Sequence, residues 1–510
     1  MVVIDGNSLK LSDVIKVAVG HEKVQLSESG RQAMLASRNY IESCITRGET
    51  MYGVNTGFGA FSQVRINDNQ IEELQRNLIR SHCAGVGKPF AAPVVRALML
   101  LRANTLARGQ SGVRPLLVEK LIELLGKNVI PWIPEQGSVG ASGDLAPLSH
   151  LALSLMGEGY VMAADGSKKS TAAVFKELTI EPLTLKAKEG LSLINGCQVM
   201  TALGLLTLHD AQQTLKLFDL SAAMTLEATR GSRKPFDPLI APTRPHPGEA
   251  KTAKNVLRIL GETSPIAETH INCKRVQDAY SLRCVPAVHG AVKDVVERSL
   301  QVLEREANSS TDNPLVFAEE GKVLSCGNFH GEPVALELDF AAIAMANLGN
   351  ISERRLAKLI DPTFSELPAF LATEGGLQSG LMIVHVAAAS LVSENKGLCH
   401  PASVDSIPTS SDKEDHVSMG TIAARKFARV LDNVKNILAM ELLGASQGLG
   451  FLEPLQPVAG VQAAYSKIRE SVAFAKNDRV FSDDVEKIRV MIDDGSLLSV
   501  VEKKIGTLTI

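Results

Sequence analysis

Apolar residues recur at helical spacing over long stretches of this 510-residue chain, and that pattern limits the folds it can adopt. Between Phe427 and Leu438 they follow the spacing i, i+3, i+4, i+7 and i+11, which predicts a helix ending near Gly444. The segment 348–359 has a similar pattern, and Asp361-Pro362 should end that helix because proline cannot continue it. Arg96 to Arg108 forms a third helical pattern. Long stripes with few strand patterns predict a mainly α fold, a large helix bundle with little β structure.

Three other stretches bear on the organisation of the chain. Residues 315–324 read as a β-hairpin. The most apolar run, 380–392, is too short to cross a bilayer and contains a histidine, so we expect a buried core helix. The clearest break is 231–250, which holds five prolines and is either a linker or an ordered surface loop inside one large unit. We therefore expect an N-terminal part, 1–230, and a mainly helical part, 231–510, integrated into one functional unit.

The composition argues against several classes of function. The 53 basic and 56 acidic residues are interspersed and give a net charge of -3, so we expect no nucleic-acid partner. The seven cysteines are scattered without Cys-x-x-Cys spacing, which favours reduced thiols over a disulfide framework. The N-terminus lacks a basic region followed by an apolar one. These features predict a cytoplasmic protein with no membrane partner.

The most informative local feature is the run of small residues from Gly137 to Gly143, Gly-Ser-Val-Gly-Ala-Ser-Gly. Taken alone, such a run is a flexible surface turn. However, Pro134 precedes it and a helix-like apolar segment resumes at Asp144, and tight loops beside helix starts are where backbone strain and chemistry coincide. The spacing excludes a Gly-x-Ser-x-Gly nucleophile elbow, a P-loop and a dinucleotide-binding glycine motif.

Extended to Leu145 and beyond, this run resembles the signature of the histidine/phenylalanine/tyrosine ammonia-lyase family. In that family an Ala-Ser-Gly triplet cyclises into 4-methylideneimidazol-5-one (MIO). The resemblance implies that Ala141, Ser142 and Gly143 form this group here. The amide nitrogen of Gly143 would attack the carbonyl carbon of Ala141, and loss of water, including the Ser142 hydroxyl, would leave an electrophilic methylene. No dissociable cofactor is expected.

Other segments resemble family motifs in the same order. The loop from Met51 to Gly59 resembles one whose tyrosine covers the site and transfers a proton, which makes Tyr52 a catalytic candidate; alone, it reads as a turn with one packed aromatic. A phenol needs positive surroundings to act as a base near neutral pH. The resemblance also implies that His82 binds the substrate side chain, and that Asn195 binds both the electrophile and the substrate.

Gln277, Tyr280 and Arg283 are spaced three apart, which predicts that they share one side of a helical turn. Such a trio alone is usually a solvated face. The resemblance implies instead that it grips the amino acid. Arg283 would pair with the α-carboxylate, Gln277 would bind the substrate, and Tyr280 would be an acid or base.

Two segments complete the match. The resemblance implies that Phe329, in Asn-Phe-His-Gly-Glu, packs against the electrophile, and that Glu414 is both catalytic and substrate-binding. The stretch 413–416, Lys-Glu-Asp-His, has metal-ligand side chains but lacks Glu-x-x-His or His-x-x-x-His spacing, so we expect no metal site.

Two positions favour an imidazole substrate. Relatives acting on phenylalanine or tyrosine resemble Phe-Leu or His-Leu where this chain has Ser81-His82, and Asn-Gln-Asp where it has Lys-Glu414-Asp. A carboxylate can accept an imidazole N–H, which a phenyl ring does not offer. The resemblance therefore implies non-oxidative conversion of L-histidine to trans-urocanate and ammonia, by a homotetramer with active sites shared between subunits.

Three alternatives remain. One is a relative that acts on phenylalanine or tyrosine, or an aminomutase of the same family. A second is a fumarase/aspartase-type helical lyase, which is remote because residues 309–314, Ser-Ser-Thr-Asp-Asn-Pro, lack that family's Gly-Ser-Ser-x-Met-Pro-x-Lys loop. A third is a non-catalytic helical scaffold in which Ser142 stays uncyclised.

Overall fold

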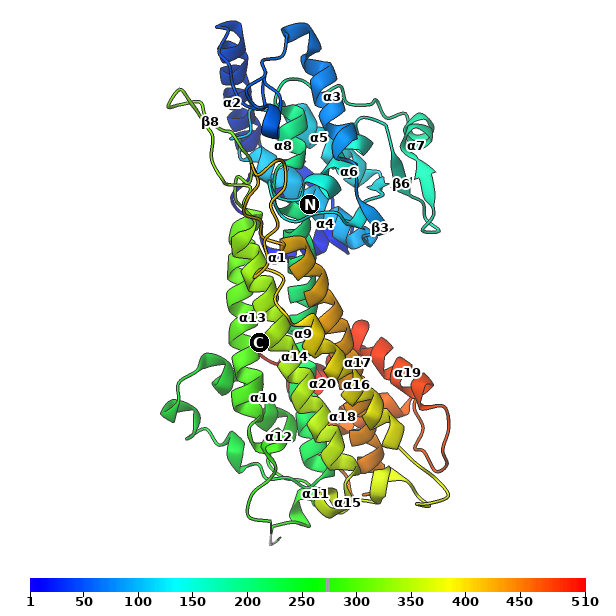
Figure 1. Ribbon diagram of the computed structural model, residues 1–510. Coiled ribbons are helices and arrows are strands. Elements are labelled where there is room, and N and C mark those ends of the chain that lie inside the picture. The colour runs from blue at the N-terminus through cyan, green and yellow to red at the C-terminus, as the bar shows by residue number, and fades with distance from the viewer. Residues whose placement is uncertain (272, 274) are drawn as a thin grey trace. The chain divides into compact units, whose positions relative to one another are not determined.

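The computed structural model describes residues 1–271, 273 and 275–510, and it is mainly α-helical (Figure 1). Helices take up 58% of the chain and strands 7%, which confirms the predicted fold class. The chain forms two compact units. Unit 1 comprises Met1–Leu206, Leu300–Asp339 and Pro401–Arg425, and unit 2 comprises Thr207–Ser299, Phe340–His400 and Lys426–Ile510.

Unit 1 contains a central buried helix, α4 (Ala92–Ala107), with every residue from Val94 onward buried. It packs against α1 (Leu11–Ala18) and α5 (Pro115–Gly126). The helix predicted at Arg96 to Arg108 is therefore confirmed. The other helices lying wholly in unit 1 are α2 (Glu28–Thr46), α3 (Ile71–His82), α6 (Leu145–Leu155), α7 (Thr171–Leu178) and α8 (Glu189–Ile194), with the 3-10 turns η1 (Gly59–Phe61) and η2 (Asp68–Gln70).

The strands of unit 1 are short and form small separate sheets. Strand β1 (Val2–Ile4) pairs in parallel with β2 (Val24–Leu26), and the three remaining sheets are antiparallel. They are β3 (Val86–Pro89) with β5 (Pro134–Gln136), β4 (Ile130–Pro131) with β6 (Tyr160–Met162) and β7 (Lys168–Ser170), and β8 (Leu315–Phe317) with β9 (Lys322–Leu324). The last pair is the predicted hairpin, with Leu315 opposite Leu324. Strand β5 matters most for the site, because it leads directly into the small-residue run.

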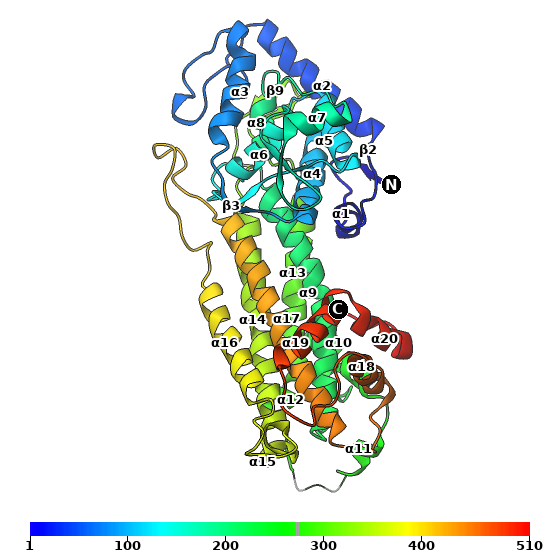
Figure 2. The same cartoon turned by 90° about the vertical axis from the view of Figure 1, so that its right-hand side faces the viewer.

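Four long helices contribute residues to both units: α9 (Gln198–Ala228), α13 (Val285–Ala307), α14 (Glu332–Ile360) and α17 (Gly420–Gly450). Their unit 2 portions lie side by side in both ribbon views (Figures 1 and 2). The other helices of unit 2 are α10 (Pro247–Leu260), α11 (Pro265–Glu268), α12 (Tyr280–Arg283), α15 (Pro362–Ser365), α16 (Met382–Leu398), α18 (Ala459–Arg469), α19 (Phe481–Asp493) and α20 (Ser496–Ile505), with η3 (Lys234–Phe236), η4 (Ala241–Thr243) and η5 (Ala369–Leu371).

Helix α17 corrects one predicted boundary. Its apolar stripe is present as expected, but the helix runs through Gly444 to Gly450. A Cβ atom at Gly444 would lie 2.6 Å from Leu356 Cδ1 of α14. The glycine therefore permits close packing of two helices and does not end one. Helix α14 does end at Ile360, as predicted.

One prediction about unit 2 is wrong, and one alternative left open by the sequence is decided. The apolar run 380–392 forms most of α16, but Ile383 and Val386 are 65% and 54% exposed, so this helix is not buried within one chain. The proline-rich stretch 231–250 holds η3, η4 and the start of α10, all inside unit 2, so it is an ordered loop and not a linker between the two units.

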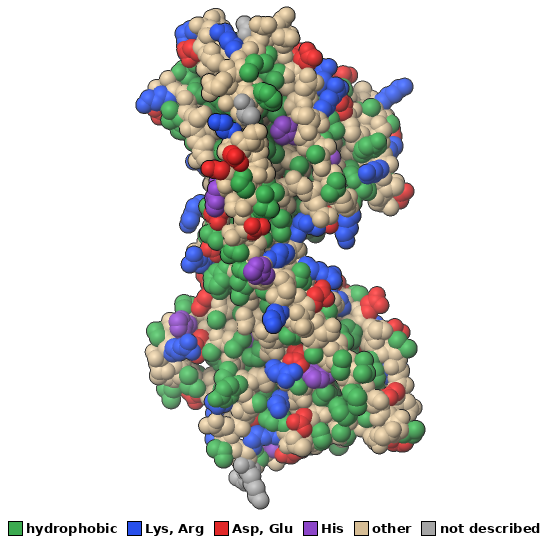
Figure 3. Space-filling view, viewed as in Figure 1, with side chains coloured by type: hydrophobic (Ala, Val, Ile, Leu, Met, Phe, Trp, Pro, Cys, Tyr) green, Lys and Arg blue, Asp and Glu red, His purple; other side chains and the backbone are tan. Residues whose placement is uncertain are grey.

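The surface and α14 bear on possible partners. Basic and acidic side chains are interspersed over the face shown in Figure 3. Helix α14 is long and apolar enough to cross a membrane, but 67% of its most apolar window is buried inside the protein. Such burial is typical of the core helix of a soluble protein.

Candidate active site

The small-residue run forms a tight turn that only glycine allows at key positions. Gly140 and Gly143 adopt positive φ angles of 68° and 75°. A Cβ atom at Gly140 would lie 2.2 Å from Ser418 Oγ, and one at Gly143 would lie 2.3 Å from the carbonyl oxygen of Gly196. Side chains at either position would displace neighbouring backbone or side-chain atoms. The glycines therefore let segments distant in sequence close around the turn.

A buried carboxylate, Asp144, anchors the end of this turn. Its Oδ2 accepts hydrogen bonds from the backbone N–H groups of Val199 (2.9 Å) and Met200 (3.1 Å) in the first turn of α9. Its Oδ1 accepts from the hydroxyls of Ser138 (3.1 Å) and Thr421. Burial raises the pKa of Asp144, and these four donors oppose that rise. An acid at a helix N-terminus satisfies donors that have no partner within the helix, so Asp144 fixes the turn to α9 and α17.

The backbone of the triplet is folded back on itself. The amide nitrogen of Gly143 donates a hydrogen bond to the carbonyl oxygen of Ala141. The following amide, at Asp144, donates to the carbonyl of Gly196 at 2.7 Å. Ala141 is buried against Val417 and the neighbouring Met419. The nitrogen assigned as nucleophile by resemblance thus lies beside the carbonyl it would attack, and the residues present fit an MIO group.

Glu414 lies directly beside Ser142, although 272 positions separate them in the chain. The Ser142 hydroxyl donates to Glu414 Oε1 at 3.0 Å. Thr409 holds the other carboxylate oxygen with its hydroxyl at 2.7 Å, and its backbone pairs with that of Glu414. The loop between them contains three consecutive residues with positive φ, at positions 410–412. This loop brings a carboxylate to the triplet.

Tyr52 belongs to the same cluster. Its hydroxyl accepts a hydrogen bond from the Gly59 backbone at 3.5 Å. Its loop is held by Asn55, whose side-chain oxygen accepts from the Met51 backbone at 2.8 Å. Burial raises the pKa of Tyr52, and the Glu414 carboxylate raises it further. Within one chain, therefore, the Tyr52 phenol is protonated at neutral pH.

Asn195 ends helix α8 and presents an unusual side chain. Its Nδ2 donates to the carbonyl of Asn313 (3.2 Å) and to Asp312 Oδ1 (3.5 Å). Its Oδ1 is buried and has no hydrogen-bond partner among the described residues. The next residue, Gly196, pairs with Gly143 through a backbone bridge. Asn195 therefore carries a buried acceptor without a partner, and it directly precedes the residue that pairs with the triplet. A free buried acceptor is expected of a group that binds a ligand.

Phe329 is half-buried at a turn close to the same segment. Its carbonyl accepts a hydrogen bond from Cys197 Sγ at 2.9 Å. The next residue, His330, stacks on His416, with ring centroids 5.6 Å apart. These contacts tie the predicted Phe329 segment both to Cys197, beside Gly196, and to the Glu414 segment.

His82 is the last residue of α3, and its tautomer follows from its contacts. Nδ1 lies 2.8 Å from the carbonyl oxygen of Leu78, which can only accept, so Nδ1 donates there and, in the neutral ring, Nε2 is an acceptor. Gly85, three residues on, lies against the turn, because a Cβ atom at Gly137 would be 3.2 Å from its Cα. The structure thus brings the segment after His82 to the start of the small-residue run, although no direct contact joins His82 to Ser142.

Gln277, Tyr280 and Arg283 belong to unit 2, whereas unit 1 alone builds the Ser142 cluster. Helix α12 begins at Tyr280 and Ala279 is extended, so the prediction that Gln277 shares its helical turn is wrong. Tyr280 is 71% exposed, and the Arg283 guanidinium lies 4.4 Å from the centre of its ring. Arg283 Nε is buried without a partner among the described residues. Two of the three residues therefore form a contacting pair.

Comparison with known proteins assigns the family. Residues 9–470 match the model of the family described as aromatic amino acid lyase. This chain belongs to the aromatic amino acid lyase family. It is 50% identical over 507 residues to a histidine ammonia-lyase of Gloeobacter violaceus, covering 99% of this chain and 98% of that protein.

Two solved structures extend the comparison to the fold. A histidine ammonia-lyase from Trypanosoma cruzi matches with a TM-score of 0.91 and 42% identity, over 99% of this chain and 95% of that one. A tyrosine aminomutase from Streptomyces globisporus matches with a TM-score of 0.93 and 38% identity, over 99% and 98%. The fold is thus shared by aromatic amino acid lyases and an aminomutase.

Sequence reasoning missed some residues that hold this candidate site together. The apolar pattern marks Asp144 only as the start of a helix, although an acid directly before a helix is a recognisable capping signal. Thr409, Thr421 and Asp312 had no signal in the sequence, because their importance depends on contacts between distant segments. Within the described ranges, no group of three or more His, Cys, Asp or Glu side chains could hold a metal ion.

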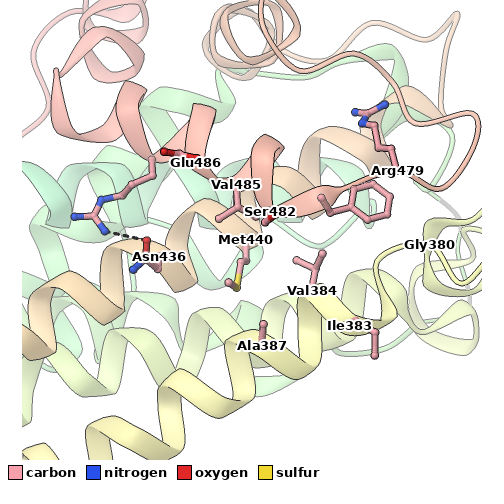
Figure 4. A pocket seen from close by; sticks show the side chains of 12 residues that line it. Gly380, Ile383, Val384, Ala387, Asn436, Met440, Arg479, Ser482, Val485 and Glu486 are labelled. Carbon is pink, nitrogen blue, oxygen red and sulfur yellow. Dashed lines mark hydrogen bonds between the residues drawn. The ribbon is translucent and has the colours of Figure 1, made fainter.

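Unit 2 contains a separate pocket of about 520 Å³ between α16, α17 and α19 (Figure 4). Its lining is largely apolar and includes Val384, Ala387, Met440 and Val485. None of the predicted site residues lines it. This pocket is therefore separate from the Ser142 cluster.

Proposed function

We propose that this member of the aromatic amino acid lyase family is a histidine ammonia-lyase. It would remove ammonia from L-histidine without oxidation and yield trans-urocanate, the first step of histidine degradation. The 50% identity with the Gloeobacter violaceus protein over nearly the whole chain supports this. The observation that carries the choice of substrate is the contact of Glu414 with Ser142, which brings a carboxylate suited to an imidazole N–H beside the triplet.

The reaction needs more than one catalytic device. The β-proton of the substrate is weakly acidic and the amino group is a poor leaving group. General acid–base catalysis contributes about 10²–10⁴-fold, whereas enzymes typically lower barriers by about 8–23 kcal/mol. An MIO group formed from Ala141, Ser142 and Gly143 would supply an electrophile at the site. Asn195 and the Gly196 backbone are the neighbours that would hold it.

The chain's own residues would bind and orient the substrate. Glu414 would accept the imidazole N–H, and His82, with Nε2 as an acceptor, would face the same ring. Arg283 would pair with the α-carboxylate, and Gln277 would bind the amino acid. Phe329 would pack against the electrophile. Tyr52 and Tyr280 would move protons.

We propose further that the enzyme is a cytoplasmic homotetramer with shared active sites. Leu336, Phe340 and Ile343 form an exposed apolar stripe on α14, and Ile383 and Val386 form one on α16. Contiguous exposed apolar stripes are typical of surfaces that another subunit covers. Units 1 and 2 of different chains would then form one integrated catalytic unit.

The first test is an assay of the purified protein with L-histidine, followed by urocanate absorbance. Ser142→Ala should lower kcat by about 10³-fold or more, the scale seen when a main stabilising element of an active site is removed. The intact mass of the wild-type protein should be lower than the sequence mass by two waters, and that of the variant should not. Full activity in the Ser142→Ala variant would remove the MIO group from the proposal.

The likeness to tyrosine aminomutase makes a second function worth testing. Parallel assays with L-phenylalanine and L-tyrosine, including a search for β-amino products, separate the two. Histidine should be the preferred substrate by kcat/KM. A preference for tyrosine with β-tyrosine as product would replace the histidine assignment by an aminomutase.

A further inference from the structure

A fully buried ion pair lies behind Asn195. Lys188 Nζ donates to Asp312 Oδ2 at 2.9 Å and to the Ser192 hydroxyl at 2.8 Å. The Ser192 hydroxyl donates to the same carboxylate oxygen at 2.9 Å. The side chains of Lys188 and Asp312 are both 0% exposed. The cation and the hydroxyl thus hold one oxygen of the carboxylate in a fixed position.

The other carboxylate oxygen faces Asn195. Asp312 Oδ1 accepts from the Asn313 backbone at 2.7 Å and lies 3.5 Å from Asn195 Nδ2. The Asn313 carbonyl is a second acceptor for Nδ2, at 3.2 Å. Two acceptors on one side of a carboxamide require its NH₂ end there. The orientation of Asn195 is therefore determined by its partners, and Oδ1 is the end left for a ligand.

The pair is costly to build, which argues against a role in stability alone. Lys188 precedes α8 with a positive φ of 72°, a conformation that non-glycine residues rarely adopt. Burial lowers the pKa of Lys188, and the Asp312 carboxylate opposes that change. Desolvation of buried ion pairs commonly cancels their attraction, so apolar residues would support the fold as well. Strained and buried polar groups of this kind are typical of functional sites.

We propose that Lys188 and Asp312 are positioning residues for Asn195. Together they keep its Nδ2 turned toward Asp312 and Asn313 and hold Oδ1 in place as the acceptor for the reaction. This inference rests on the proposed function, since it gives Asn195 a defined geometry within that site. Their hydrogen bonds reach Asn195 and its neighbours and not the triplet, so both act through the asparagine.

The central experiment compares Asp312→Asn, Lys188→Met and the double variant. Asp312→Asn keeps the size of the side chain but allows an NH₂ group to face Asn195 Nδ2. It should lower kcat by about 10- to 100-fold with KM changed less than about threefold, because small misplacement of a reacting neighbour has effects of that size. The double variant removes both charges, so its Tm should recover toward wild type while kcat stays low. Recovery of kcat together with Tm would show a purely structural role and overturn the proposal.

A double-mutant cycle with Asn195→Ala tests whether the effect passes through the asparagine. In that background, Asp312→Asn should change kcat by less than about twofold, because the group it positions is gone. A full additional loss would contradict the proposal. Glu189→Gln is the matched control. Glu189 is a buried carboxylate on α8, the helix that Asn195 ends, and its partner is Arg114 and not Asn195. It should lower Tm and leave kcat within about twofold of wild type.

A crystal structure of the Asp312→Asn variant gives a readout independent of activity. The Asn195 carboxamide should be turned or displaced while the backbone of α8 is unchanged. An unmoved Asn195 would overturn the positioning role even if the protein acted on another amino acid. Absence of urocanate formation by the wild-type protein would contradict only the proposed function.

Discussion

At the residue scale, the site depends on its glycines, which have no side chain, as much as on its polar side chains. Gly143 has a positive φ, and its α-carbon faces the backbone of Gly196 at a distance that leaves no room for a methyl group. The amide nitrogen of Gly143 also donates a hydrogen bond to the Ala141 carbonyl oxygen. Backbone atoms can approach so closely only where no Cβ intervenes.

Gly143→Ala should therefore block formation of the electrophile. The added Cβ would lie 2.3 Å from the Gly196 oxygen, so the turn has to open and the amide moves off the carbonyl. We expect an intact mass with no loss of water and kcat reduced by about 10³-fold or more. Gly166→Ala is the control: it has a similar φ of 79°, but nothing lies within 4 Å of its Cβ position. That variant should lose about 1–2 kcal/mol of stability and keep its modification. A modified, active Gly143→Ala protein would show that the close contact is not required.

At the scale of elements, the sequence predicted what local pattern determines. The helix ends near Arg108 and at Ile360, the 315–324 hairpin and the tight turn before Asp144 all follow from proline, glycine and apolar spacing. Burial of α16 was predicted wrongly, because an apolar run does not reveal whether the rest of its own chain covers it. The roles of Asp312 and Thr421 could not be predicted, since contacts between distant segments create them. The resemblance named Glu414, but only the structure brings it to Ser142.

Glu306, near the end of α13, is a partly buried carboxyl group with a raised pKa. Burial raises the pKa of Glu306 to about 7, and the Asp144 carboxylate contributes to the rise. The Glu306 side chain hydrogen-bonds with Cys197, which lies just before α9. The folded protein thus binds this proton more tightly than the unfolded chain, whose glutamate titrates near 4.5.

The stability contributed by protonated Glu306 should be full below pH 4.5 and lost as the pH rises through about 7. Glu306→Gln keeps the neutral form at every pH. The free energy of unfolding of the variant, relative to wild type, should therefore increase by roughly 3 kcal/mol between about pH 5 and pH 9. Denaturant unfolding at several pH values measures this. Glu320→Gln, at an exposed position in the β8–β9 turn, should show a pH-independent difference. A flat difference for Glu306→Gln would mean that Glu306 is ionised in the folded protein at all these pH values.

At the scale of the whole molecule, the two units divide the proposed chemistry. Unit 1 holds the triplet, Glu414, Tyr52 and Asn195, whereas unit 2 holds Tyr280 and Arg283. If the sites are shared between subunits, the two sets of residues come from different chains. A chain that lacks one set of residues could then still form an active site with a neighbouring chain that lacks the other set.

Mixed tetramers test this division directly. Ser142→Ala and Arg283→Ala should each be nearly inactive, but chains produced together should regain about a quarter of wild-type activity by random assortment in a symmetric oligomer. A mixture of Ser142→Ala with Glu414→Gln should regain almost nothing, because those two side chains contact each other within one unit. Equal recovery in both mixtures, or in neither, would contradict sites assembled from unit 1 and unit 2 of different chains.

The contacts around Gly140 and Asp144 also have a consequence for biosynthesis. Ser418, Met419 and Thr421 reach back to hold a turn that was translated almost three hundred codons earlier. On the proposed function, a nascent chain emerging from the ribosome carries an inert Ala-Ser-Gly segment until most of its length has been made. The electrophile would then form only after that late segment has packed against the turn. Chains that fail to fold would therefore stay unreactive.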